Sequence, residues 1–172
     1  MKRINLLIFL SIFFFIFSCK KSENESISTF KALKDGADWI STSNWSNLSK
    51  TYNNFIINGI KRDSKYYQEE SLNLTFNNSD ISEFNTVTKF TSSWSYIVGG
   101  DLLTDSFVID TTSDNLIQIT SIDTINKHIS GTFKVKLLKN KNFSNTGEIM
   151  NFTSGQFNLN YQEVYQYNSK SK

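Results

Sequence analysis

The stretch Ile129-Ser130-Gly131-Thr132-Phe133-Lys134-Val135-Lys136-Leu137 decides the fold class, because apolar and polar residues alternate along it. Every second residue from Ile129 to Leu137 is apolar or glycine. Successive side chains of a strand point to opposite faces, so this alternation predicts a strand with one buried and one solvated face. The same period of two recurs at 72–76 and 157–161, and no stretch beyond residue 18 keeps a helical apolar pattern over three turns. The chain is therefore predicted to be all-β.

Polar turn signals separate the predicted strands. Asp35-Gly36 has the composition of a tight hairpin turn, and 123–128 and 140–147 are polar connections. Ser154-Gly155 lies inside a strand pattern, where glycine is typical of a bend or bulge. The predicted strands cover about residues 29–34, 53–60, 68–77, 87–98, 104–111, 115–122, 129–138, 148–154 and 157–161.

Eight or nine short strands in one domain of this length predict a single antiparallel β-sandwich. An eight-stranded up-and-down barrel is the alternative. We place the β-rich domain at 29–165 and a polar C-terminal tail at 166–172.

The amino terminus has the organisation of an export signal. Lys2 and Arg3 precede a short apolar stretch, and Ser18 and Cys19 precede an abruptly polar segment. The segment Ile16-Phe17-Ser18-Cys19 resembles the lipobox of bacterial lipoproteins, with Phe17 bulkier than is usual. We predict a lipoprotein signal peptide at 1–18, cleavage between Ser18 and Cys19, lipidation of Cys19, and a flexible tether over 19–28.

Cys19 is the only cysteine, so no disulfide can form within the chain. Two or three acyl chains on this residue would hold the protein firmly on a membrane. We expect an outer-membrane lipoprotein, and the acidic residues after Cys19 favour the cell surface over the periplasmic face.

The charge balance argues against a nucleic-acid partner. The whole chain has 18 Lys and Arg against 16 Asp and Glu. Removal of residues 1–18 takes away Lys2 and Arg3 and no acidic residue, so the mature charges cancel. We expect partners to be the membrane, through the acyl chains, and a glycan or an envelope protein.

Several short motifs resemble a family of small Bacteroidota lipoproteins that is described as a domain of unknown function. They are an F-x-A-x-x-D-G-x-x-W segment at 30–39, an I-S-G-T-F segment at 129–133 and a G-x-F segment at 155–157. The resemblance implies a β-rich, exported, lipid-anchored domain and no particular activity. In physical terms, Gly131 and Gly155 are expected to permit close backbone or aromatic packing on a sheet face, and Trp39 to fill the core.

The sequence offers little for catalysis, and we predict neither an enzyme nor a cofactor. His128 is the only histidine and is expected to be a solvated residue in a polar turn. A single histidine and an acylated cysteine cannot supply the usual ligands of a zinc ion, so we predict no metal. A calcium site stays an alternative, because calcium needs only oxygen ligands and the chain has acidic residues at Asp101, Asp105, Asp110 and Asp114. A carboxylate-dependent glycan hydrolase is a further alternative. We interpret its candidate residues, Glu69, Glu70 and Glu83, as solvated residues at a strand or loop edge.

Binding is the function that the aromatic residues favour, either as an interaction module or through a cleft that holds a small ligand or sugar. The candidate ligand-binding residues are Trp45, Tyr66, Tyr67 and Trp94. Trp94 shares a strand face with Tyr96, so an inward-packed pair is the competing interpretation. Thr111 and Thr124, each preceded by aspartate, resemble acceptors for O-linked glycans, which would add mass to the peptide carrying them.

Replacement of Cys19 by alanine tests the predicted anchor. Without the acylated thiol, the protein is expected to leave the membrane fraction, which is measured by blotting fractionated cells. Protease treatment of intact cells then reports which face of the membrane the wild-type domain occupies. A C19A protein that stays as firmly membrane-bound as wild type would contradict the lipoprotein assignment.

Overall fold

The computed structural model describes residues 28–140 and 148–165, and these residues form eleven strands and one short 3-10 turn, η1 (Asn78–Asp80). The prediction of an all-β fold is confirmed. The strands are β1 (Thr29–Lys34), β2 (Ala37–Ile40), β3 (Ser43–Ser49), β4 (Asn54–Asp63), β5 (Gln68–Asn77), β6 (Thr86–Val87), β7 (Thr91–Val98), β8 (Leu102–Ile109), β9 (Leu116–Asp123), β10 (His128–Lys139) and β11 (Ile149–Val164).

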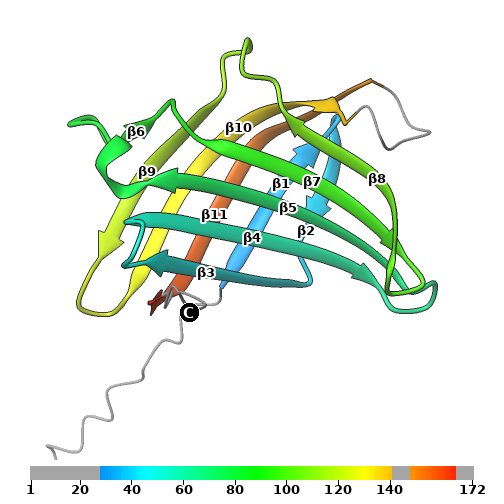
Figure 1. The fold of residues 1–172 in the computed structure, drawn as a ribbon, viewed down its shortest axis with the longest axis horizontal. Helices are drawn as coiled ribbons and strands as arrows, with labels where there is room; N and C mark the ends of the chain where they lie inside the picture. Colours follow the sequence, from blue (N-terminus) through cyan, green and yellow to red (C-terminus); the bar gives the residue numbers. More distant parts are fainter. Residues whose placement is uncertain (1–27, 141–147, 166–172) are drawn as a thin grey trace, which may run out of the picture.

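All eleven strands belong to one mixed sheet in the order β2-β1-β11-β3-β4-β5-β7-β8-β10-β9-β6. The sheet curves back on itself, so that β3, β4, β5 and β7 face β1, β10 and β11 across the core (Figure 1). β10 also pairs with β11, and three residue pairs join β10 to β8. The shape combines the two predicted architectures: two facing layers, as in a sandwich, joined through continuous strand pairing.

One pairing departs from the predicted antiparallel sheet. The end of β11 runs parallel to β3, with Tyr161 beside Ser46, whereas the other pairings are antiparallel. The strand prediction missed β2, which is very short, and β3, which is rich in Ser and Asn, and it merged the short strand β6 with β7 in the segment 87–98. The nine predicted segments otherwise lie on observed strands, and 148–154 and 157–161 form the single strand β11.

Aromatic rings of β1, β2, β10 and β11 pack against one another in the core. Phe30 packs edge-on to Trp39 and lies 5.2 Å from Phe133, measured between ring centroids. Trp39 packs in turn against Phe152 at 5.6 Å. Trp39 has no exposed surface, which confirms its predicted place in the core.

Two glycines of β10 and β11 each receive a phenylalanine ring from the opposite strand. Gly131 pairs with Phe157, and Phe133 pairs with Gly155. A Cβ atom at Gly131 would lie 2.5 Å from the Phe157 ring, and one at Gly155 would lie 2.5 Å from the Phe133 ring. The predicted close packing is confirmed, and it is reciprocal: each strand supplies one ring and one bare backbone.

Turns and bends follow the predicted chemistry. Asp35 and Gly36 both have positive φ, 50° and 84°, as a two-residue hairpin turn of type I′ requires. Ser154, with φ of 51°, bends β11 beside Gly155, and the register with β10 shifts there. The bulge prediction for this dipeptide is therefore confirmed.

No helix in the described part of the chain is long and apolar enough to cross a membrane. The predicted signal peptide with Ser18, the predicted lipidation site Cys19, most of the predicted tether, the 141–147 connection and the predicted 166–172 tail lie outside the described residues.

Replacement of Gly131 by alanine tests the reciprocal packing. The new methyl group would meet the Phe157 ring and the backbone oxygen of Gln118, so one strand must move. We expect a loss of about 1–3 kcal/mol in unfolding free energy, measured by urea denaturation. The control is Thr132→Val, an exposed neighbour, for which a change of about 0.5 kcal/mol or less is expected. Equal stabilities for the two variants would show that the close approach is not needed.

Candidate ligand-binding cleft

The inner face of the sheet changes from apolar to polar toward one end of the molecule. On β5, the inward positions run from Leu74 and Leu72 to Glu70, and on β8 from Phe107 to Asp105. On β1, Lys34 follows Ala32 in the same way. Polar side chains therefore point into the space between the layers, where the core ends and water can enter.

Glu70 joins the two layers at this boundary. Its Oε2 atom accepts hydrogen bonds from Nε1 of Trp39 at 2.9 Å and from Nε1 of Trp94 at 3.2 Å. The same oxygen lies 2.5 Å from Nζ of Lys34, which also sits 4.8 Å from the centre of the Trp94 ring. One half-buried carboxylate thus satisfies two buried indole donors and a lysine, and no donor in the described part of the chain reaches its Oε1 atom.

A cleft of about 560 Å³ opens above Glu70. The strand registers place four of its lining residues in a row across β4, β5, β7 and β8, in the order Lys61, Glu70, Tyr96 and Asp105. Directly paired residues share a sheet face, so all four side chains face the cleft. Glu70 and Asp105 are two strands apart, which separates their Cα atoms by roughly 9.5 Å.

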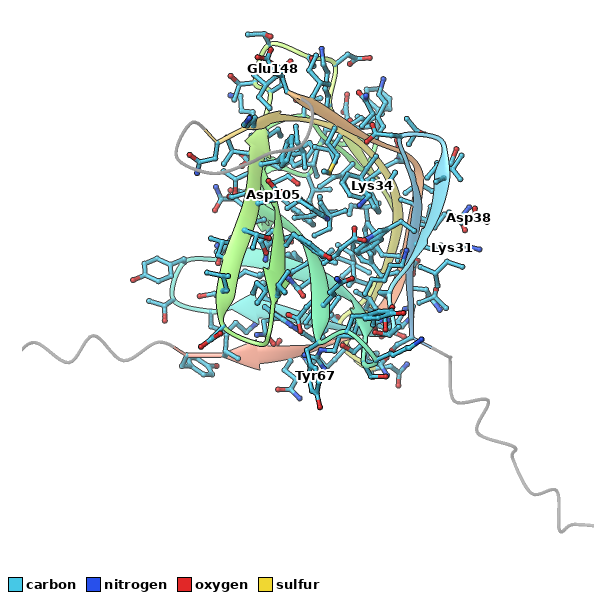
Figure 2. The ribbon with its side chains drawn as sticks, turned by 90° about the vertical axis from the view of Figure 1, so that its right-hand side faces the viewer. Lys31, Lys34, Asp38, Tyr67, Asp105 and Glu148 are labelled. Atoms are coloured by element: carbon cyan, nitrogen blue, oxygen red, sulfur yellow. The ribbon has the colours of Figure 1, made fainter. Side chains whose placement is uncertain are left out.

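Two parallel aromatic rings line the cleft. Trp94 and Tyr96 are stacked at 7° with centroids 6.1 Å apart, and Trp94 also meets Phe107 edge-on. Trp94 is buried, at 3% exposed, whereas Tyr96 is half-buried. Figure 2 looks onto this end, with Lys34 and Asp105 on opposite layers.

The charges around the cleft balance. Lys34, Lys61 and Arg62 contribute three positive charges, and Asp63, Glu70 and Asp105 contribute three negative charges. Lys34 is bound to Glu70, and Arg62 donates from Nε to Oε2 of Glu69 at 2.7 Å. The cleft therefore presents polar groups without a net charge.

The four aromatic residues predicted to bind a ligand do not lie together in the structure. Their role in binding stays a prediction. Trp94 lines the cleft, with its ring packed inward as the competing interpretation required. Tyr67 is 74% exposed and lies at the edge of the same end (Figure 2), and the neighbouring Tyr66 has Nζ of Lys65 over its ring at 4.9 Å. Trp45 is exposed on the outer face of β3, away from the cleft.

Sequence reasoning missed Lys34, Glu70, Tyr96 and Asp105 as parts of one site. Glu70 was expected to be a solvated edge residue, and this interpretation is wrong, because it accepts hydrogen bonds from two buried indoles. The available signal was the pattern around it: Glu70 falls on the same alternating face as Leu72, Leu74 and Phe76. A charged residue in register with a buried apolar face indicates a site or a paired charge.

The remaining acidic candidates lie apart from one another. Asp105 lines the cleft, Asp110 accepts hydrogen bonds within its own turn, and Asp114 pairs with Lys134. Among residues 28–140 and 148–165, no group of three or more His, Cys, Asp or Glu side chains is placed to hold a metal ion. His128, expected in a solvated turn, begins β10, where its Nε2 atom is buried without a hydrogen-bond partner in the described chain.

The two threonines predicted as glycan acceptors occupy similar turns. Oδ1 of Asp110 accepts from the Thr112 amide at 3.0 Å, and Oδ1 of Asp123 accepts from the Ile125 amide at 2.9 Å. Hydrogen bonds from Ser113 and Thr112 hold the pKa of Asp110 well below its usual range, and bonds from Asn126 lower the pKa of Asp123. Thr111 and Thr124 are exposed in these turns, and their modification stays a prediction.

Comparison with known proteins gives one family. A family model with the description Domain of unknown function (DUF6252) matches residues 26–159. No curated protein and no solved structure matches the chain. The match covers the layers that form the cleft.

Replacement of Glu70 by alanine tests the junction between the layers. The indole N–H groups of Trp39 and Trp94 and the Lys34 ammonium would lose their shared acceptor, so we expect a loss of about 2–3 kcal/mol in unfolding free energy. Urea denaturation followed by tryptophan fluorescence measures this loss. The control is Glu69→Ala, which breaks a more exposed ion pair with Arg62 and should cost about 1 kcal/mol or less. Equal losses for both variants would contradict a special role for Glu70.

Proposed function

The chain belongs to the DUF6252 family, and we propose that it is an exported, lipid-anchored binding module whose cleft holds a neutral sugar ring without transforming it. The observation that carries this proposal is the position of Tyr96. Tyr96 has a half-buried ring, and its backbone is paired with Glu70 on one neighbouring strand and with Asp105 on the other. A sugar has an apolar face of C–H groups and a rim of hydroxyls, and this row offers a complementary surface to both.

The polar groups suit hydroxyl recognition. A carboxylate accepts short, strong hydrogen bonds from O–H donors, and Oε1 of Glu70 receives no donor from the described residues. Gln68 and Ser64, which also line the cleft, can both donate and accept. Few polar groups at fixed positions around an aromatic surface are typical of small-molecule sites.

The balanced charge favours a neutral ligand over an anionic or cationic one. A phosphorylated or carboxylated ligand would meet Asp63, Glu70 and Asp105, and a cationic ligand would meet Lys34, Lys61 and Arg62. A neutral ligand has no such like-charge partner, so it loses no binding energy to repulsion.

Binding is favoured over hydrolysis by the contacts of Glu70. A glycan hydrolase needs two carboxylates across the bond to be cleaved, and Glu70 and Asp105 line one cleft. Three donors, however, already occupy Oε2 of Glu70, and two of them belong to core tryptophans. A carboxylate fixed in this way suits a role in positioning a ligand, so we propose no enzymatic activity.

The predicted lipid anchor supports the location that we propose. A signal ending at Ser18 and acyl chains on Cys19 would place the domain on the outer membrane, with the cell surface as the favoured side. Surface exposure would bring the cleft into contact with external glycans, whereas a periplasmic position would favour envelope components.

Isothermal titration of the detergent-solubilised, full-length lipoprotein with neutral mono- and oligosaccharides tests the proposal. The probes are the glucose, mannose, galactose and N-acetylglucosamine methyl glycosides and their tetrasaccharides. Tyr96→Ala is expected to weaken binding at least tenfold, because the sugar loses its stacking surface.

The control is Tyr52→Ala, which removes an exposed tyrosine from the β3–β4 turn and should leave affinity unchanged. Absence of binding for every probe, or equal binding by Y96A and wild type, would overturn the assignment. Release of reducing sugar that Asp105→Asn abolishes would instead support the hydrolase.

A further inference from the structure

Three exposed side chains with large apolar parts lie at one end of the sheet. They are Tyr52 in the β3–β4 turn, Ile125 in the β9–β10 turn and Tyr165 directly after β11. Ile125 is 88% exposed, more than any other large apolar side chain in the described part of the chain. Apolar groups that gather on a surface, unlike single ones, indicate a contact with a partner.

Glu163 of β11 holds the two turns together. Its Oε1 atom lies 3.0 Å from Nζ of Lys50, in the β3–β4 turn, and 2.8 Å from Nζ of Lys127, in the β9–β10 turn. The Lys50 amide also donates to the carbonyl oxygen of Val164, and the Tyr161 amide donates to that of Lys127. The two turns and the end of β11 therefore form one surface. We call it the turn surface, and its exposed or half-buried members are Lys50, Tyr52, Ile125, Lys127 and Tyr165.

The predicted tether joins the domain at the same end. Thr29 pairs with Asn158 and His128 pairs with Asn160, so β1 begins near the start of β10, which follows the β9–β10 turn. Figure 1 shows the start of β1, the end of β11 and the β9–β10 turn along one edge of the molecule. The nine peptide bonds from Cys19 to Ser28 span at most about 30 Å even when fully extended. Acyl chains on Cys19 would therefore keep this end of the domain close to the lipid.

The side chains of the turn surface suit a layer of lipid headgroups. Tyrosine is enriched where a membrane meets water, because its ring is apolar and its hydroxyl group is polar. An isoleucine at a turn tip can enter the boundary between headgroups and acyl chains. A lysine can bury its methylene groups there while its ammonium group stays among the headgroups.

We propose that the turn surface lies on the same lipid layer that holds the acyl chains, with Ile125 inserted and the two tyrosines at the level of the headgroups. The inference rests on the lipid anchor of the proposed function and adds an orientation to it. β4 begins beside the turn surface and ends at the cleft, and its ten residues span roughly 30 Å, so the cleft stands clear of the lipid. The orientation requires an unmodified Thr124, because a glycan beside Ile125 would separate the turn from the lipid.

Fluorescence quenching in phosphatidylcholine vesicles tests this orientation. The full-length lipoprotein carries an environment-sensitive fluorophore on Tyr52→Cys, or on Thr111→Cys for reference, since the acylated Cys19 does not react with the label. The vesicles contain lipids with a nitroxide on the acyl carbons nearest the headgroup. We expect a loss of about half the fluorescence or more at position 52. Little loss is expected at position 111, because β9 separates the Thr111 turn from the β9–β10 turn.

Ile125→Asp should lower the quenching at position 52 to the level at position 111, while the acyl chains keep the protein on the vesicles. Ile149→Asp is the matched control, because it changes an exposed isoleucine at the other end of β11 and should leave the quenching unchanged. Equal quenching at the two positions, or no effect of I125D, would overturn the orientation and leave the anchor and the cleft standing. Failure of the full-length protein to float with the vesicles would overturn the predicted anchor and this inference together.

Discussion

The close approach of two phenylalanine rings to two glycines, across β10 and β11, is the constraint on which the rest of the structure depends. Each ring covers a backbone that has no side chain of its own, so the two strands twist and bend together. β11 can then follow β10 and β1 along one layer and still reach β3 in the other. Both layers face a common core because β11 joins them on one side and the pairing of β10 with β8 joins them on the other.

The same arrangement explains why a polar site can exist beside an aromatic core. Aromatic side chains on the inner face of the sheet fill the core. Closer to one end of the molecule, the inward-facing positions of the same strands carry charged residues such as Glu70 and Asp105. Glu70 lies at the boundary where the core ends. Its carboxylate accepts hydrogen bonds from the indole N–H groups of Trp39 and Trp94, whose rings pack in the core. The Glu70 side chain therefore both stabilises the core tryptophans and lines the cleft.

The sequence predicted the strands well and the site poorly, for a physical reason. Alternation, turn residues and the glycine positions are local properties, and they gave the all-β class, the Asp35-Gly36 turn and the bend at Gly155. The cleft joins residues from β1, β4, β5, β7 and β8, and only the pairing order brings Glu70 beside Tyr96 and Lys34. A contact between layers, such as that of Trp39 with Glu70, produces no periodic pattern in the sequence. β3 was missed because it lacks the alternating apolar residues that indicate a strand.

The position of β11 in the chain affects how the protein reaches its native state. Of the described strands it is the last to be synthesised, yet it pairs with β1, β3 and β10. Until it is available, those strands have open edges that could pair with other chains. Contacts so distant in sequence also make folding slow. The nascent domain should therefore depend on chaperones until its last strand is in place, and shortened products should aggregate.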